Sequence, residues 1–317
     1  MSEQKNEQGH DIKEPIAASA AEVVQAQAPG LHGLYNGPES AFRMAFDDQA
    51  FLTSPETRGI RFQLEITKPD VVFRQQGIKH TIVVFGSARF KSPADAQAQL
   101  ANAKTDEEIR LAKQAVKNSI HYQKAYDFGR IVAERNLTIP TDQRLHIVTG
   151  GGPGVMEAAN RGAFEAGDKT IGMNIALPFE QEPNPYITPE LCFQFHYFAS
   201  RKFALLSAGS STPGFSIEPG KGMGSQQQDD GGGACAIVCG GGGFGSLDEL
   251  FETAALIQVG KMRRRPLILL GKEYWTNFMN IQFLADEGAI SQEDIDLIQI
   301  ADSAEEAWKI IENFYSL

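Results

Sequence analysis

The residues with the clearest chemical meaning lie in the stretch CGGGGFGSLDEL, residues 239–250. Four glycines run together and a fifth follows Phe244. Because glycine has no side chain, a phosphate oxygen can come close to the backbone N–H groups of such a stretch. Two acids, Asp248 and Glu249, follow at the start of an expected helix, whose positive end attracts an anion. The stretch therefore predicts an anion site with carboxylates close to it.

The acids also have a purely structural explanation. Ser246 and Glu249 have the spacing of a capping box, in which the serine caps the helix and the glutamate reaches back. Acids in a first helical turn complement the helix dipole as well. On this explanation they contribute about 1 kcal/mol to helix stability and nothing more. These residues alone leave both explanations open.

Two further glycine turns follow apolar runs. FGSAR, residues 85–89, comes after one run, and TGGGPGVMEAAN, residues 149–160, after the next. If the runs are parallel strands, the three turns meet at the carboxyl edge of one sheet, where α/β proteins bind ligands. The alternative is that each is only a tight strand-to-helix turn. Three turns at one edge favour a shared phosphate site.

These turns must be positioned by an alternation of strands and helices. Short, apolar, β-branched runs, typical of strands buried on both faces, occur at 81–85, 145–149, 170–174, 234–239 and 266–270. Helical stretches are expected at 120–135, 154–166, 198–208 and 247–259. A further strand is expected near residue 297, before a last helix. The pattern predicts an α/β fold with a doubly wound, mostly parallel sheet flanked by helices.

Composition excludes several classes of protein. The net charge of −11 disfavours nucleic acid and anionic membranes as partners, because both repel an acidic surface. No apolar run approaches eighteen residues, and the N-terminus lacks a signal-peptide pattern. The three cysteines have no Cys-x-x-Cys spacing, which fits a reducing compartment. We therefore expect a cytoplasmic protein without a metal site.

Three segments, in this order, resemble the Lonely Guy family. They are GGGPGVMEAANRGAFEAG at 150–167, HYFASRKF at 196–203 and GGGGFGSLDELFE at 240–252. Members of this family are phosphoribohydrolases that release the base from a nucleoside 5′-monophosphate, and many were once described as lysine decarboxylases. The resemblance extends over roughly residues 80–315. It implies a Rossmann-like fold, a nucleoside monophosphate substrate, no cofactor and a homodimer or higher homo-oligomer.

The family signature is Pro-Gly-Gly-x-Gly-Thr-x-x-Glu. Its glycines match Gly242, Gly243 and Gly245, and its glutamate matches Glu249. Two positions depart from it, with Gly241 for the proline and Ser246, which keeps a hydroxyl, for the threonine. These departures favour the main alternative, a nucleotide-binding or sensor protein of the same fold without catalysis.

The resemblance assigns roles to the residues. Glu249 is the catalytic carboxylate, which stabilises positive charge on the ribose and orients or deprotonates the attacking water. Arg201 is its catalytic partner, which holds phosphate or departing base and lowers the pKa of Glu249. The predicted substrate-binding and phosphate-binding residues are Gly242, Gly243, Gly245, Ser246, Gly151, Gly152, Gly154, Ser87, Arg89, Lys202, Asp248 and Met156. For Arg89 a structural ion pair is an equal alternative. An NAD-dependent oxidoreductase is disfavoured, because FGSARF lacks the Gly-x-Gly-x-x-Gly fingerprint after the first strand.

The predicted organisation has three parts. Residues 1–30 are polar and rich in Ala and Gln, which predicts a disordered tail. Residues 31–78 are expected to form an extension that packs on the core. Residues 79–317 are the predicted Rossmann-like nucleotide-binding catalytic domain, with a helical insertion at 93–118 and a flexible loop at 209–233.

Overall fold

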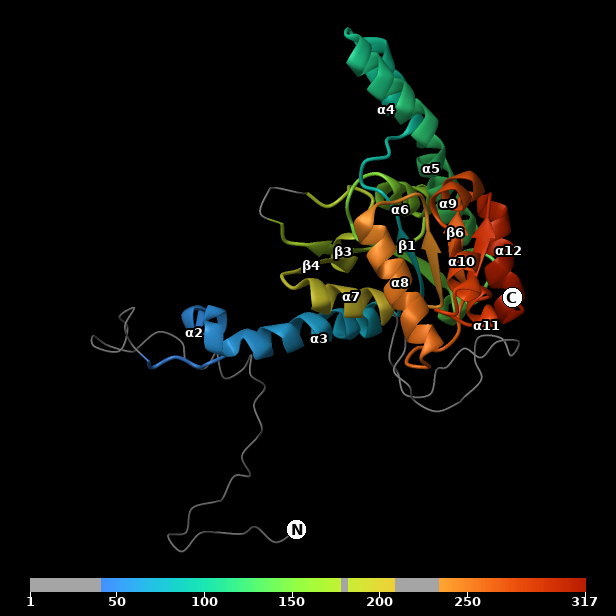
Figure 1. Cartoon of the computed structure of the whole chain (residues 1–317). Helices are drawn as coiled ribbons and strands as arrows, with labels where there is room; N and C mark the ends of the chain where they lie inside the picture. The colour runs from blue at the N-terminus through green and yellow to red at the C-terminus, as the bar shows by residue number, and fades with distance from the viewer. Residues whose placement is uncertain (1–40, 178–181, 209–233) are drawn as a thin grey trace, which may run out of the picture. The chain divides into compact units, whose positions relative to one another are not determined.

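The computed structural model of the 317-residue chain describes residues 41–177, 182–208 and 234–317 (Figure 1). The predicted tail at 1–30 and the predicted loop at 209–233 lie outside these residues. The chain divides into two units, Met1–Arg58 and Gly59–Leu317. The domain boundaries expected at residues 30 and 78 stay predictions.

The larger unit contains one parallel sheet. Its strands are β1 (His80–Phe85), β2 (Leu145–Thr149), β3 (Thr170–Ile175), β4 (Cys192–Phe195), β5 (Ala236–Cys239), β6 (Leu267–Leu270) and β7 (Ile298–Ala301). They lie in the order β4-β3-β2-β1-β5-β6-β7, and every pair of neighbours is parallel. The order changes direction at β1, which pairs with β2 on one side and with β5 on the other. The predicted α/β fold is confirmed.

Helices follow the strands along the chain. They are α3 (Arg58–Gln76), α4 (Pro93–Asn102), α5 (Asp106–Asn136), α6 (Val155–Glu165), α7 (Phe198–Leu206), α8 (Phe244–Gln258), α9 (Lys272–Phe278), α10 (Ile281–Asp286), α11 (Gln292–Ile295) and α12 (Ala304–Tyr315), with single 3₁₀ turns η3 (Thr141–Gln143) and η4 (Pro189–Leu191). None of the described helices is both long and apolar enough to cross a membrane.

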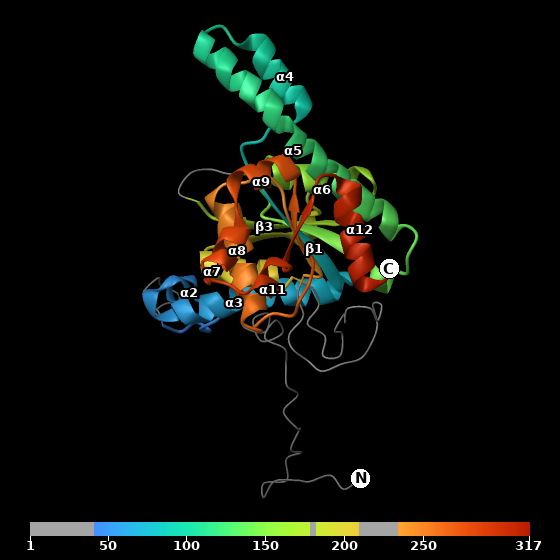
Figure 2. The same cartoon turned by 45° about the vertical axis from the view of Figure 1, so that its right-hand side comes forward.

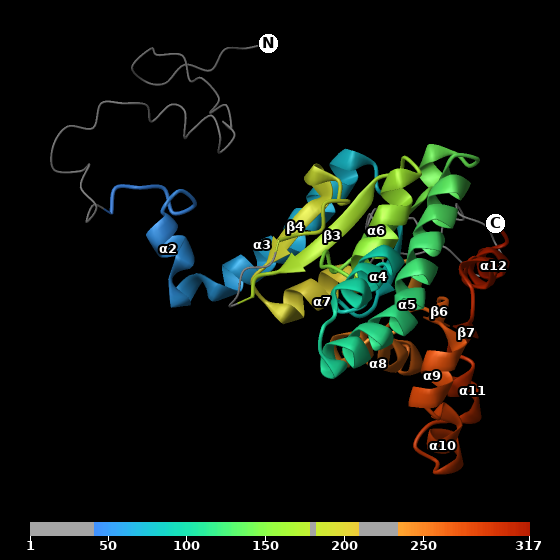
Figure 3. The same ribbon diagram turned by 90° about the horizontal axis from the view of Figure 1, so that it is seen from above.

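The helices cover both faces of the sheet (Figures 1 and 3). Side chains of β1 alternate between two cores, as expected for a central strand. Ile82 and Val84 point to the core that contains α5, α6 and α12, whereas Val83 and Phe85 point to the core that contains residues of α3, α7, α8 and α9. The central strand is thereby buried on both faces of the sheet.

The smaller unit has little regular structure in its described part. It contains α2 (Gln49–Thr53) and the 3₁₀ turn η2 (Pro55–Thr57). Asp48 caps α2 by accepting a hydrogen bond from the backbone N–H of Phe51 at 3.1 Å.

Two elements differ from the expectations. β4 was not predicted, because CFQF is an edge strand in which buried and exposed side chains alternate, unlike the continuous apolar runs. The insertion at 93–118 is helical, but its second half is continuous with the next helix, since α5 runs unbroken from Asp106 to Asn136 behind a capping box at Thr105. With α4 it forms a helical hairpin that projects beyond the carboxyl ends of the strands (Figures 1 and 2).

Candidate active site

The three glycine turns meet where the strand order changes direction. Ser87, in the turn after β1, joins them through its backbone. Its N–H donates to the carbonyl of Gly241 at 2.9 Å, and its carbonyl accepts from the N–H of Val155 at 3.0 Å. The turn after β5 is therefore connected through Ser87 to the start of α6, at the edge where α/β sheets bind ligands.

Buried amides fix the turn after β2. The side chain of Asn184 donates to the carbonyls of Gly151 and Gly152 at 3.2 and 3.1 Å and to Oδ1 of Asn160 at 3.0 Å. The hydroxyl of Thr149 donates to the same Asn160 oxygen at 2.6 Å and accepts from the N–H of Gly151 at 2.9 Å. These buried hydrogen bonds hold the turn in its conformation and use up its carbonyl groups.

Two glycines of this turn are required by the fold itself. Gly151 and Gly154 have φ angles of +74° and +72°, which other residues rarely adopt. A Cβ at Gly151 would also collide with the side chain of Asn174, and one at Gly154 would collide with the backbone of Ser87 and Ala88. The structural explanation of these two glycines is sufficient, whether or not a ligand lies beside them.

The glycines after β5 divide into two kinds. A Cβ at Gly242 would strike the side chain of Ser246, so Gly242 is needed for packing. Gly243 and Gly245 have no positive φ, and apart from their own local backbone no atom of the described residues lies within 4 Å of the position that their Cβ would occupy. Nothing in the described fold therefore requires glycine at these two positions. A ligand that approaches the backbone closely would require it, because a side chain would stand in its way.

The helix α8 begins earlier than the capping box predicts. Its N-cap is Gly243, which offers no side-chain oxygen, and the first N–H that bonds back is that of Leu247, to the Gly243 carbonyl at 3.0 Å. The N–H groups of Phe244, Gly245 and Ser246 have no acceptor among the described residues. The capping-box prediction is therefore wrong, because the glycine loop already turns into helix at Phe244 and places Ser246 inside the first turn.

Glu249 lies one turn further along α8 and is buried. Its exposed fraction is 7%, and its Oε2 atom has no hydrogen-bond donor among the described residues. Burial raises the pKa of Glu249 to about 7, although the positive charges of Lys202 and Arg201 act in the opposite direction. Arg201 thus has the predicted influence, but desolvation outweighs it. A buried carboxyl group that ionises near neutral pH is typical of a catalytic acid or base.

Arg201 approaches the same place from α7. Its Nε donates to the carbonyl of Met173, at the end of β3, at 2.8 Å. Its Nη2 lies so close to Gly150 that a Cβ there would collide with it. Burial lowers the pKa of Arg201 and the charge of Glu249 raises it, yet no carboxylate of the described residues lies within the 4.0 Å of an ion pair. The guanidinium keeps donors free for a ligand.

Lys202, the next residue, is already paired. Its Nζ lies 3.0 Å from Oδ2 of Asp248 and 2.7 Å from Oε2 of Glu252. These pairs outweigh partial burial and raise the pKa of Lys202. Lys202 and Asp248, both predicted to bind substrate, neutralise each other in this structure and connect α7 with α8.

Two predicted residues remain, Met156 and Arg89. Met156 is half-buried, and its sulfur lies 2.9 Å from the position of a Cβ at Gly150, beside Arg201. The backbone N–H of Arg89 donates to the hydroxyl of Ser87 at 3.1 Å, while its side chain is exposed. No described carboxylate lies within ion-pair distance of Arg89, so the structural ion pair considered for it is not found.

A support beneath the glycine loop was missed by the sequence analysis. The hydroxyl of Tyr274, on α9, donates to the carbonyl of Gly242 at 2.7 Å, and the indole N–H of Trp275 donates to the carbonyl of Cys239 at 3.1 Å. No motif marks these residues, and the apolar run 266–270 just before them is the only local signal.

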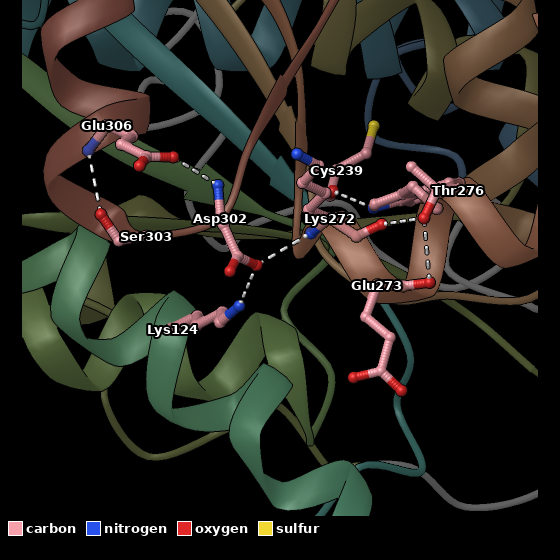
Figure 4. A network of polar contacts seen from close by, with 9 residues as sticks. Lys124, Cys239, Lys272, Glu273, Thr276, Asp302, Ser303 and Glu306 are labelled. Atoms are coloured by element: carbon pink, nitrogen blue, oxygen red, sulfur yellow. Dashed lines mark hydrogen bonds and ion pairs between the residues drawn. The ribbon is translucent and has the colours of Figure 1, made fainter.

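The start of α9 is itself anchored (Figure 4). Oδ1 of Asp302 accepts from the backbone N–H of Lys272 at 3.0 Å and pairs with Nζ of Lys124, on α5, at 2.6 Å. α5 thereby holds the turns after β6 and β7 together, and with them the helix that supports the glycine loop.

Comparisons with known proteins give two family matches. Residues 232–311 match the family model described as "Possible lysine decarboxylase", and residues 111–188 match that of the SLOG cluster4 family. No curated protein matches the chain. Among solved structures, the Moco carrier protein from Chlamydomonas reinhardtii is 18% identical with a TM-score of 0.40, over 75% of this chain and 98% of that one. The X-ray structure of TM1055 is 21% identical with a TM-score of 0.41, over 74% and 98%.

The first family match spans β5, the glycine loop, α8 and Glu249, and the second spans the glycine turn after β2. Together they contain two of the three segments on which the resemblance was based, 150–167 and 240–252. The resemblance predicted from the sequence is confirmed by these two matches.

Proposed function

We propose that the protein hydrolyses the N-glycosidic bond of a nucleoside 5′-monophosphate, of the AMP or cytokinin riboside monophosphate type, and releases the free base and ribose 5-phosphate. The observation that carries the proposal is the buried carboxyl group of Glu249, without a donor on Oε2 and with its pKa raised to about 7, one helical turn from the uncapped start of α8. The resemblance to the Lonely Guy family makes a phosphoribohydrolase the expected type of enzyme.

The phosphate belongs at the start of α8. The N–H groups of Phe244, Gly245 and Ser246 are unpaired among the described residues, and no acid lies in the first turn of this helix. A phosphate there accepts hydrogen bonds from the backbone and interacts with the positive end of the helix dipole. The open space at Gly243 and Gly245 allows the phosphate to reach the amides.

The ribose then lies toward Glu249. In the reaction the bond between C1′ and the base nitrogen breaks, and a bond forms between C1′ and a water oxygen. As positive charge develops on the sugar, the carboxylate of Glu249 stabilises it and accepts a proton from the water. The departing base nitrogen takes up this proton from Glu249, which returns to its carboxylate form. Arg201, with free donors beside Gly150 and Met156, holds phosphate or base.

The test is a panel of nucleoside 5′-monophosphates with chromatographic detection of free base and ribose 5-phosphate. Release of both products in equal amounts supports the proposal. Saturable nucleotide binding without release would contradict it and favour the non-catalytic nucleotide-binding protein, the reading suggested by Gly241 and Ser246.

The glycine loop provides a prediction that separates ligand binding from folding. Gly243→Ala should leave the melting temperature unchanged, because the backbone conformation is open to alanine and the new methyl group meets no atom of the described structure. It should raise the KM for the nucleotide at least about tenfold, since the methyl group projects where the phosphate must approach. Enzyme kinetics and thermal melts measure both effects.

Gly59→Ala is the matched control. Gly59 also has an empty Cβ position, but it lies at the start of α3 and outside the glycine loops. This variant should keep the KM, and its melting temperature should stay the same or rise slightly, because alanine is favoured over glycine in a helix. An unchanged KM in Gly243→Ala would show that no ligand approaches the loop at this point.

We also propose a homodimer, as the family resemblance implies. Phe198 and Phe203 on α7, and Phe244 and Phe251 on α8, are 43–94% exposed, and large exposed aromatic side chains are typical of protein–protein contacts. A cytoplasmic location and binding to neither nucleic acid nor membrane stay predictions.

A further inference from the structure

The helix that carries Arg201 receives its cap from another helix. α7 has Tyr197 as its N-cap, and no side chain of its own segment caps it. Glu65, near the middle of α3, takes this role. Its Oε1 accepts from the backbone N–H of His196 at 2.8 Å, and its Oε2 accepts from the N–H of Tyr197 at 3.3 Å and from the hydroxyl of Ser200 at 2.5 Å.

Further contacts fix α3 at the same point. Arg61 donates to the hydroxyl of Tyr197 at 3.4 Å, and the rings of Phe62 and Tyr197 lie 5.8 Å apart. On the next turns of α3, Phe73 is buried in the core beneath the sheet. The carboxylate of Glu65 is therefore presented to α7 by a helix that is itself anchored, and its charge complements the positive end of the α7 dipole.

The first turn of α7 determines where Arg201 points. The N–H of Arg201 makes an early helical hydrogen bond of α7, to the carbonyl of Tyr197 at 3.2 Å, and Ser200 immediately precedes it. Ser200 is fully buried and is held by Glu65. Fraying of this turn moves the Cα of Arg201 and breaks the bond from its Nε to the carbonyl of Met173.

We propose that Glu65 is a positioning residue for Arg201. It acts through Ser200 and the first turn of α7 and touches no substrate itself. α3 precedes both segments matched by the family models, so no motif assigns this role. The effect on activity rests on the proposed function, whereas the effect on α7 does not.

The proposal also explains why α8, rather than α7, is free for an anion. At α7 the helix start is occupied by a carboxylate from within the protein. At α8 the cap is Gly243, without a side-chain acceptor and without an acid in the first turn. A phosphate at the backbone N–H groups that begin α7 would be repelled by Glu65, so only the start of α8 can bind one through its backbone.

The experiment uses Glu65→Gln, which keeps the size of the side chain but removes its charge and one acceptor oxygen. Amide hydrogen exchange should become at least about tenfold faster at residues 197–202, while the sheet keeps its protection. The kcat/KM for the nucleotide should fall at least about tenfold. Lys68→Gln, an exposed residue of the same helix, is the control and should change neither.

A double variant tests whether Glu65 acts through Arg201. In the Arg201→Ala background, Glu65→Gln should cause no further loss of kcat/KM, because the group that it positions is already absent. A further loss of kcat/KM in the double variant, or faster amide exchange in α7 with full activity, would overturn the proposal.

If Glu65→Gln does not fold, Ser200→Ala removes only the hydrogen bond from the serine hydroxyl to Glu65, and the same measurements are made on that variant. If the wild type hydrolyses no nucleotide, the proposed function fails. The role of Glu65 is tested separately, because unchanged amide hydrogen exchange at residues 197–202 in Glu65→Gln would overturn it.

Discussion

Glu249→Gln is expected to lower the rate of nucleotide hydrolysis at least about a hundredfold, the usual scale for removing a positioned charge or base. Glutamine has nearly the same shape, but it cannot accept a proton from water or offer a full negative charge to the ribose. Nucleotide binding should persist, since the phosphate is held by the start of α8 rather than by this side chain. Single-turnover kinetics and equilibrium binding measure the two quantities separately.

The same substitution should stabilise the fold in alkaline solution. The pKa of Glu249 is raised from 4.5 to about 7 by burial, so the folded protein favours the neutral carboxyl group. The stability that comes with this preference is fully present below pH 4.5 and is lost as the pH rises through 7, where the buried group must become charged. At pH 8 the buried carboxylate is charged and costs about 3 kcal/mol relative to a neutral side chain. Thermal melts should therefore show Glu249→Gln more stable than the wild type at pH 8 and similar to it at pH 4.5.

Two comparisons make this prediction specific. The wild-type rate should rise with an apparent pKa near 7, because only the ionised form of Glu249 accepts the proton. Glu252→Gln, one turn further along α8, should keep most of the activity, since Glu252 pairs with Lys202 and has no proposed contact with the substrate. A wild-type rate in Glu249→Gln would mean that the carboxylate has no part in the chemistry.

Arg201→Ala is expected to reduce kcat/KM at least about a hundredfold, whereas Lys202→Ala should reduce it far less. The guanidinium of Arg201 uses Nε on Met173 and keeps donors that grip an anion in two places. The ammonium of Lys202 is already engaged by Asp248 and Glu252, so its removal should lower stability rather than activity.

Steady-state kinetics with thermal melts distinguish the two variants. Arg201→Lys is the conservative control and should recover little activity, because an ammonium cannot bond to Met173 and to a ligand in the same fork geometry. Equal losses of activity in Arg201→Ala and Lys202→Ala would show that the pair acts only through its summed positive charge.

The sequence by itself determined the framework. β2 occupies residues 145–149 as predicted, and β1, β3, β5 and β6 lie within a residue or two of their apolar runs. Such runs specify central parallel strands because both faces must be buried, and this requirement is local in the sequence. The glycine turns and the family motifs were visible for the same reason, since their residues are neighbours along the chain.

Only the tertiary structure decided how the site works. Ser246 and Glu249 have the local pattern of a capping box, but the glycine loop, bonded to Ser87 and Tyr274, starts the helix at Phe244 instead. The raised pKa of Glu249 is a consequence of burial, which no spacing encodes.

The residues that support the site come from distant segments. Asn184 reaches the turn after β2 from more than thirty residues away, and Glu65 reaches α7 across more than 130 residues. These contacts arise only when the sheet has assembled and α3 has packed on it. A single sequence contains no periodicity or motif that brings such partners together, because their pairing is a property of packing and not of local order.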